Sequence, residues 1–181
     1  MSDLCDDDLM RMYREGDADA FDALFDRYRA PVYTFSRMML GHADGAEDVL
    51  QETFLAVART ARNYHARGRF RPWLLRIARN LCLNRIQSER VRRRVIAEGG
   101  LEVIEPCSHE PSRPERVEAD ERMTRLRRLI AELPERQREA IVLYAFEQMH
   151  CREIGEVLDV PINTVKTLIH RARSTLASAW Q

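Results

Sequence analysis

The sequence has little of what small exported or membrane-bound proteins contain. Its four cysteines, Cys5, Cys82, Cys107 and Cys151, are scattered without close pairing, which argues for free thiols rather than a disulfide scaffold. No apolar run approaches the length needed to span a bilayer, and the start MSDLCDDDLM lacks a basic region followed by an apolar stretch. We therefore expect a cytoplasmic protein without membrane insertion.

The short motifs of common enzymes are also missing. We find no phosphate-cradling glycine loop, no nucleophile elbow and no HExxH pair. The sequence therefore predicts no catalytic residue and no cofactor, and we expect a protein that is not an enzyme.

A metal site is the one alternative that the cysteines raise. Cys107 with His109, and His150 with Cys151, could supply ligands, but their spacing matches no zinc pattern. We therefore expect no metal and interpret Cys107 as a free thiol in a linker. A regulatory thiol remains an open alternative, and a metal- or thiol-sensing protein would require the cysteines to cluster.

Net charge is absent as well, because 29 lysines and arginines balance 29 aspartates and glutamates. The whole chain is not a polycation, so any binding to nucleic acid must come from local segregation of charge. Acidic residues crowd the amino terminus, residues 67–94 are rich in arginine, and Lys166, Arg171 and Arg173 form a second basic cluster. Two separated basic faces suggest two contacts with a polyanion.

What is present throughout is helical periodicity. Apolar residues recur at steps of three and four from Phe21 to Phe35, around EDVLQETF (47–54), after Pro72 and again after Met123. No segment alternates as a strand does. We expect Pro31 to kink or interrupt the first helix, Asp44 with Glu47 to cap the second, and the third to begin near Pro72.

The helical periodicity ends at about Val95, and glycines and prolines are frequent beyond it. The fold class is therefore predicted to be all-α, with two small helical domains joined by a flexible linker. We assign residues 1–94 to the first domain, 95–117 to the linker and 118–181 to the second domain.

The end of the chain has the pattern of a helix-turn-helix. Glu153–Leu158 predicts a short helix, Asp159-Val160-Pro161 a tight turn, and Asn163–Leu176 a second helix that can enter a major groove. A helical hairpin with a solvated basic face is the alternative. The outward residues suited to duplex DNA are Thr164, Lys166, Thr167, His170, Arg171 and Arg173.

Three segments in one order carry a family resemblance: EDVLQETF, FRPWLLRIARN, and LPERQREAIVLYAFEQMHCREIGEVLDVPINTVKTLIHRAR. Together they make the chain resemble a bacterial extracytoplasmic-function (ECF) RNA polymerase sigma factor over nearly its whole length. The resemblance implies a first domain that binds core RNA polymerase and opens the promoter −10 element. It further implies a second domain that reads the −35 element as duplex, and an anti-sigma factor that covers both domains.

The resemblance also gives the EDVLQETF helix a function. By composition alone its outer face is a solvated helix surface. In the family the matching helix docks on the clamp coiled coil of the largest polymerase subunit. The expected contacts are Asp48, Gln51, Glu52 and Leu55, with carboxylates for arginines and leucine as an apolar anchor.

A second set of residues is suited to single-stranded −10 DNA, in which a flipped base is held and the strand is followed by cations and rings. Core packing is the alternative for Phe70 and Trp73. The set is Tyr64, His65, Arg69, Phe70, Trp73, Arg76, Asn80, Asn84 and Gln87.

Two positions depart from the family pattern. His150 stands where serine usually caps the first helix of the hairpin, and Gly155 stands where alanine is usual. Both changes predict altered stability rather than lost function. The alternative overall function is a helix-turn-helix regulator that binds DNA without being a polymerase subunit, which would need neither the EDVLQETF face nor the arginine-rich third helix.

Overall fold

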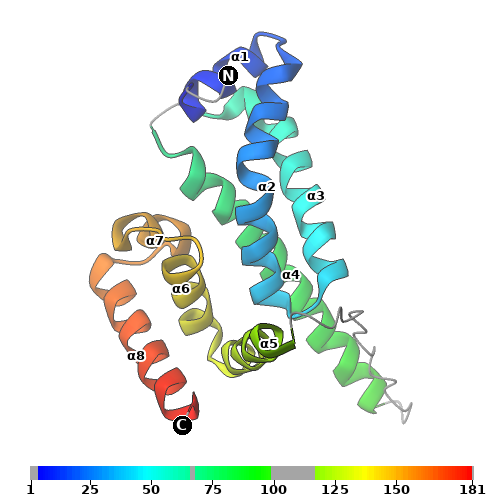
Figure 1. Cartoon of the computed structure of the whole chain (residues 1–181). Helices are drawn as coiled ribbons and strands as arrows, with labels where there is room; N and C mark the ends of the chain where they lie inside the picture. The colour runs from blue at the N-terminus through cyan, green and yellow to red at the C-terminus, as the bar shows by residue number, and fades with distance from the viewer. Residues whose placement is uncertain (1–3, 66–67, 99–116, 181) are drawn as a thin grey trace.

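The computed structural model describes residues 4–65, 68–98 and 117–180, and these form helices joined by turns (Figure 1). No strand occurs within these ranges, which confirms the all-α class. Among the described helices, none combines the length and the apolarity that crossing a bilayer requires. In chain order the elements are α1 (Asp6–Arg14), α2 (Ala18–Leu40), α3 (Ala43–Thr60), the 3-10 turn η1 (Ala61–Asn63), α4 (Phe70–Glu98), α5 (Val117–Glu132), α6 (Glu135–Ala145), α7 (Cys151–Leu158) and α8 (Ile162–Trp180).

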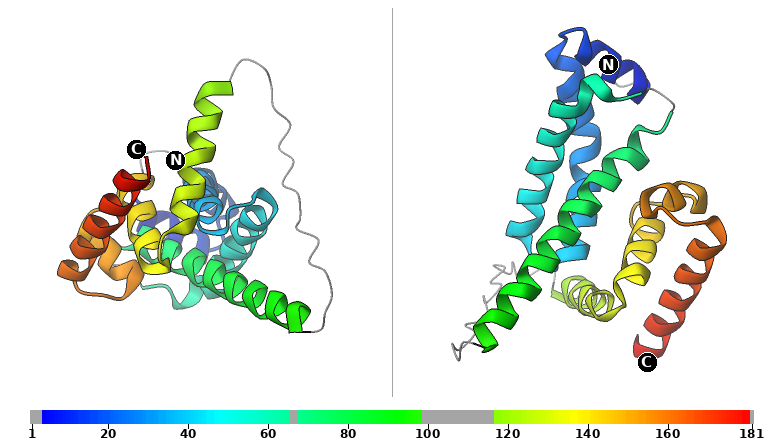
Figure 2. Two further views of the ribbon diagram at one scale, coloured as in Figure 1. Left: turned by 90° about the horizontal axis from the view of Figure 1, so that it is seen from below. Right: turned by 180° about the vertical axis from the view of Figure 1, so that it is seen from behind.

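The first half of the chain is built around α2, α3 and α4, which pack together, while α1 packs on α2 and η1 at one end (Figures 1 and 2). The apolar stripe of α2 is its inner face, with Leu24, Val32 and Phe35 fully buried, because residues three or four apart share one side of a helix. Asp17 precedes α2, and its side chain accepts a hydrogen bond from the backbone N of Asp19 at 3.0 Å.

Pro31 was expected to kink or interrupt this helix, and the expected interruption of α2 is wrong. The helix continues from Ala18 to Leu40 through the proline. Proline lacks one helical hydrogen bond, but Tyr28 and Val32 on either side of it are buried against neighbouring helices. Packing of this face offsets the missing bond.

The cap expected for the second helix is also wrong. Helix α3 begins at Ala43, and its cap is His42 rather than Asp44. The Nδ1 atom of His42 accepts a hydrogen bond from the backbone N of Gly45 at 3.1 Å. A Cβ atom at position 45 would lie 2.3 Å from the His42 ring. The glycine therefore provides the space in which a histidine can act as the cap.

Helix α4 is longer than the sequence predicts. It begins at Phe70, so that Pro72 lies in its first turn, where a missing N–H costs nothing. It continues to Glu98, and the end of the helix extends beyond the body of the molecule (Figure 1). Residues 95–98 are thus helical, Val117 already belongs to α5, and the rest of the expected linker lies outside the described residues.

The second half contains the helix-turn-helix. Helices α7 and α8 pack on each other and on α6, with Ile154, Val165 and Ile169 buried between them. Asp159 ends α7 in the left-handed conformation, at a φ of 57°. The turn passes so close that a Cβ atom on Gly155 would lie 2.9 Å from the carbonyl oxygen of Val160, which explains the glycine at this position.

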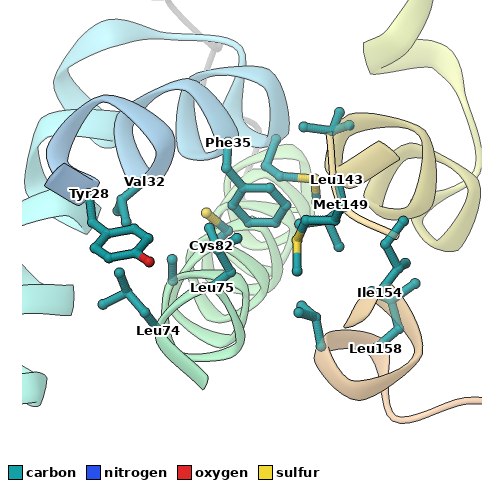
Figure 3. Close-up of a cluster of buried hydrophobic side chains, with 14 of the residues drawn as sticks. Tyr28, Val32, Phe35, Leu74, Leu75, Cys82, Leu143, Met149, Ile154 and Leu158 are labelled. Carbon is teal, nitrogen blue, oxygen red and sulfur yellow. The ribbon is translucent and has the colours of Figure 1, made fainter. Parts of the chain in front are cut away.

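The two halves share one apolar core. Helix α7 packs on α4, and α5 and α6 pack on α2. Apolar side chains from both halves form a single cluster, so the second half closes onto the first. Figure 3 shows this cluster, with Phe35, Leu75 and Cys82 on one side and Leu143, Met149, Ile154 and Leu158 on the other.

Candidate functional site

The outer face of α3 carries the side chains expected to contact polymerase. Asp48, Gln51, Glu52 and Leu55 are all exposed, as their helical spacing predicts. Leu55 exposes 53% of its surface, whereas Val49 and Phe54 on the inner side of the same helix are buried. An exposed leucine beside carboxylates fits a contact surface with an apolar anchor.

Arg85 of α4 reaches the same face and was not anticipated from the sequence. Its Nη1 lies 2.9 Å from Oδ2 of Asp48, and its Nη2 lies 2.7 Å from Oε1 of Glu52. Burial lowers the pKa of Arg85, but the hydrogen bonds to both carboxylates outweigh this and leave the pKa raised. The guanidinium holds the two acids in a fixed spacing and offsets part of their charge.

Two of the aromatic residues expected at single-stranded DNA are buried. Tyr64 exposes 7% and Phe70 1% of their surfaces, and their rings meet edge to face with centroids 5.8 Å apart. The Tyr64 hydroxyl donates to Oδ1 of Asp7 at 2.6 Å. Burial, then the bond to Asp7, raises the pKa of Tyr64, so the hydroxyl stays a donor.

The structure therefore supports the packing interpretation for Phe70, whose ring is not available to a base in this conformation. Trp73 is half-buried and packs on Tyr64 with a centroid separation of 4.8 Å. Its remaining surface lines a cleft, so Trp73 combines packing with exposure. A role for any of the three rings in DNA binding stays a prediction.

The polar members of that set are exposed. Along α4 the spacing of three and four residues brings Arg76, Asn80, Asn84 and Gln87 onto one side, and all four are exposed. Arg69 precedes the helix and is exposed, as is His65. These residues form a polar strip along α4, which we call the α4 face.

The helix-turn-helix lies beside the amino-terminal part of the α4 face, where Arg69 and Arg76 stay about half exposed. Oε1 of Glu156 in α7 lies 3.4 Å from Nη1 of Arg69. Oδ2 of Asp159 in the turn lies 3.8 Å from Nη2 of Arg76. Between them is a cleft of about 310 Å³, lined by Arg69, Pro72, Trp73, Arg76, Glu156 and Asp159. Glu156 and Asp159 were not expected at this site. Two carboxylates within a motif suited to DNA are a signal in the sequence that could have identified them.

Deeper in the same interface lie two ion pairs between the halves. Nε of Arg79 lies 2.9 Å from Oε1 of Glu139, with side chains 10% and 0% exposed. Arg71 lies 3.5 Å from the carboxylate of Glu147 and also donates to its backbone carbonyl. Burial raises the pKa of Glu139, and it raises that of Glu147 to about 7 against the opposing charge of Arg71.

The outer face of α8 is uncovered. The six residues predicted to contact duplex DNA are all exposed, whereas Val165, Ile169 and Ala172 between them are buried. The hydroxyl of Thr167 donates to the carbonyl of Asn163 at 3.0 Å, so it would meet DNA through its methyl group or as an acceptor. The exposed six are Thr164, Lys166, Thr167, His170, Arg171 and Arg173.

The cysteines do not form a metal centre in the part of the chain that the structure covers. There, no group of three or more His, Cys, Asp and Glu side chains could hold a metal ion. Cys5, Cys82 and Cys151 are free thiols, and burial raises the pKa of Cys82 to about 12. Cys107 and His109 lie outside the described residues.

Comparison with known proteins identifies both halves. Residues 24–92 match the family described as Sigma-70 region 2, and residues 123–176 match Sigma-70, region 4. The first match contains the outer face of α3 and the α4 face, and the second contains the helix-turn-helix.

Relatives that align over nearly the whole chain are also sigma factors. The ECF RNA polymerase sigma factor SigW of Bacillus subtilis is 33% identical over 172 residues, 92% of each chain. The RNA polymerase sigma-H factor of Pseudomonas aeruginosa is 31% identical over 97% of this chain and 94% of its own length.

Solved structures share the fold at lower identity. CnrH, determined in complex with the cytosolic domain of CnrY, has a TM-score of 0.73 and 23% identity, covering 97% of this chain and 96% of its own. RpoE of Bartonella quintana, determined with the anti-sigma factor NepR, has a TM-score of 0.70 and 21% identity, covering 87% of this chain and 94% of its own. With two sigma-70 regions in order and relatives aligned end to end, the chain belongs to the ECF family of RNA polymerase sigma factors.

Proposed function

We propose that this sigma factor docks on the clamp coiled coil of core RNA polymerase through the α3 face, here defined as Asp48, Gln51, Glu52 and Leu55. The observation that carries the proposal is the exposure of Leu55 on an otherwise polar helix face. A solvated helix gains nothing from an exposed leucine, whereas a protein contact gains an anchor. Arg85 holds Asp48 and Glu52 in position on that face.

Promoter DNA would meet the chain at two places. The α4 face would follow the single-stranded −10 element, because cations and amides there can contact phosphates and unstacked bases. The exposed side of α8 would enter the major groove at the −35 element, where arginine and lysine donate to guanine or phosphate. The proposal keeps the domain division expected from the sequence, with helix α4 running to Glu98 and α5 beginning at Val117.

The protein would perform no reaction itself and would need no cofactor, since polymerase supplies the chemistry. It would act with the chromosome in the cytoplasm. An anti-sigma factor is a further expected partner, in keeping with the capture of the Bartonella quintana relative with NepR.

The competing function is that of a helix-turn-helix regulator acting without polymerase. Such a protein uses α8 but has no need of the α3 face. The two functions are separated by binding to core RNA polymerase, measured by co-elution and by fluorescence anisotropy of the labelled chain.

Leu55→Arg combined with Gln51→Arg should reduce core affinity at least about tenfold, because it removes the apolar anchor and adds cations where arginines are expected on the partner. Val95→Arg is the matched control, since Val95 is also an exposed apolar residue, 62% exposed, at the far end of α4. Circular dichroism confirms folding. Equal core affinity for the folded double variant and the parent would reject the docking face, and no core binding by the parent would reject the sigma function.

A further inference from the structure

We propose that Asp7 of α1 is a positioning residue for recognition of the −10 strand, which it serves without touching DNA itself. Its carboxylate joins Tyr64 to Gly68, just before α4. The residues next to these two, His65 and Arg69, are exposed and belong to the set proposed to bind the −10 strand. The inference rests on that proposed function and adds a residue that acts through it.

Both oxygens of the Asp7 carboxylate are engaged. The Tyr64 hydroxyl donates to Oδ1 at 2.6 Å, and the backbone N of Gly68 donates to Oδ2 at 2.6 Å. Hydrogen bonds to an ionised acceptor are roughly twice as strong as those between neutral groups. Gly68 has a φ of 65°, a left-handed conformation that a residue with a side chain adopts only under strain. One carboxylate thus holds a buried ring and an exposed backbone amide at a fixed spacing.

Helix α1 is itself fixed to the first domain, so it presents Asp7 from a firm base. Leu9 on its inner side is fully buried. Oδ2 of Asp6 accepts a hydrogen bond from the hydroxyl of Tyr28 at 2.5 Å. At the other end of the helix, Nη1 of Arg14 donates to the backbone carbonyl of Tyr64 at 3.4 Å. The helix cannot move away from this region without losing these contacts.

A cluster of aromatic rings carries the position of Tyr64 into α4. The Tyr64 ring packs on Phe70 and on Trp73, with centroid separations of 5.8 Å and 4.8 Å. Tyr28 packs on Phe70 as well, at 5.3 Å. Both tyrosines that bond to acids of α1 therefore contact the first turn of α4. A shift of Tyr64 would also change the surroundings of Trp73.

The charge of Asp7 needs a reason, because a carboxylate near a surface that binds DNA repels phosphates. Asp7 is half-buried and turns both oxygens to protein donors. Asp8, the next residue, differs: it pairs with Arg11 of its own helix at 2.9 Å, a spacing that adds only weak helix stability. The two neighbouring acids thus carry the same charge but hold different groups, which provides a matched control.

The test uses the full chain assembled with core RNA polymerase, on a promoter taken from the start sites that require the protein. Asp7→Ala is the test variant and Asp8→Ala the control, because both remove one negative charge from the first turn of α1. Transcription is measured from the promoter and from copies with one base changed in the −10 or the −35 element. The ratio of intact to changed promoter gives the discrimination at each element. Urea denaturation checks folding, and Asp7→Asn, which keeps the shape of the side chain, replaces Asp7→Ala if that variant does not fold.

We expect Asp7→Ala to lower the discrimination at −10 by about three- to tenfold, because two hydrogen bonds to a charged acceptor are lost. Discrimination at −35 and affinity for core polymerase should stay at the parent's level, since α8 and the α3 face are built from other helices. A general loss of stability would not separate the two elements in this way. The control should change neither ratio. An equal loss at both elements, or a −10 loss no larger than that of Asp8→Ala, would overturn the proposal.

A second measurement asks whether Asp7 acts through Tyr64. Tyr64→Phe keeps the ring but removes the hydroxyl that Asp7 accepts from. If the two residues act together, the combined loss of −10 discrimination should be smaller than the product of the separate losses. Losses that multiply in full would show that Asp7 acts independently of Tyr64 and would also overturn the proposal.

The positioning role and the sigma function fail separately. If the parent directs promoter-specific transcription but Asp7→Ala behaves as Asp8→Ala does, only the role of Asp7 is rejected. If the parent neither binds core polymerase nor directs transcription, the proposed function itself is rejected.

Discussion

Glu139→Ala should be among the most destabilising single substitutions in this chain, because it leaves the charge of Arg79 buried without its partner. The Glu139 side chain is 0% and that of Arg79 10% exposed, and Nη2 of Arg79 donates to Oε2 of Glu139 at 3.3 Å. Removing one member of a buried pair costs about 3–5 kcal/mol. We therefore expect the free energy of unfolding to fall by about 3 kcal/mol or more.

Urea denaturation followed by circular dichroism measures this change. Arg79→Met combined with Glu139→Met is the matched control, because replacing both charges with apolar side chains of similar length removes the unpaired charge and should recover most of the stability. Two results would refute the reasoning. One is a loss below about 1 kcal/mol for Glu139→Ala, the range of an exposed pair; the other is a double variant no more stable than Glu139→Ala.

Three further predictions follow from other parts of the structure. Gly155→Ala should lower stability by about 1–3 kcal/mol in the same urea assay, because the added Cβ would lie 2.9 Å from the Val160 carbonyl; an unchanged midpoint would show that the turn moves freely. Arg171→Ala should weaken binding to the −35 duplex by about 1–3 kcal/mol with relaxed sequence preference, measured by anisotropy on matched and mismatched duplexes; an equal loss on every duplex would make Arg171 a phosphate contact. Burial raises the pKa of Glu147 to about 7, so the folded chain holds this proton more tightly than the unfolded chain, and the free energy of unfolding should fall as the pH rises from about 5 to about 8. Glu147→Gln should flatten that pH dependence in urea titrations, and an equally steep dependence would contradict the assignment.

Local periodicity predicted helices α2 to α8 and which side of each is buried, whereas α1 (Asp6–Arg14) was not expected. The stripe from Leu24 to Phe35 and the buried positions Val165 and Ile169 follow from spacing alone, because a helix repeats every 3.6 residues. The exposure of Leu55 follows from the same geometry. Both halves of the fold and the exposed parts of the candidate site could thus be anticipated.

The packing of one half on the other could not. A stripe shows that a face is buried but not which partner covers it, and Arg79 and Glu139 stand 60 residues apart without a local pattern that joins them. The same holds for Arg85, which lies 33 residues from Glu52. The interruption expected at Pro31 and the cap expected at Asp44 were wrong, because packing and the space at Gly45 overrode the local rules for proline and for caps.

The most direct test of the central claim is transcription in vitro from genomic DNA of the protein's own source, with core RNA polymerase alone and with the protein added. Sequencing of RNA 5′ ends gives the start sites. The account predicts new starts that require the protein, that share sequence elements near −10 and −35, and that disappear with Leu55→Arg plus Gln51→Arg but not with Val95→Arg. Start sites that are the same with and without the protein would contradict it.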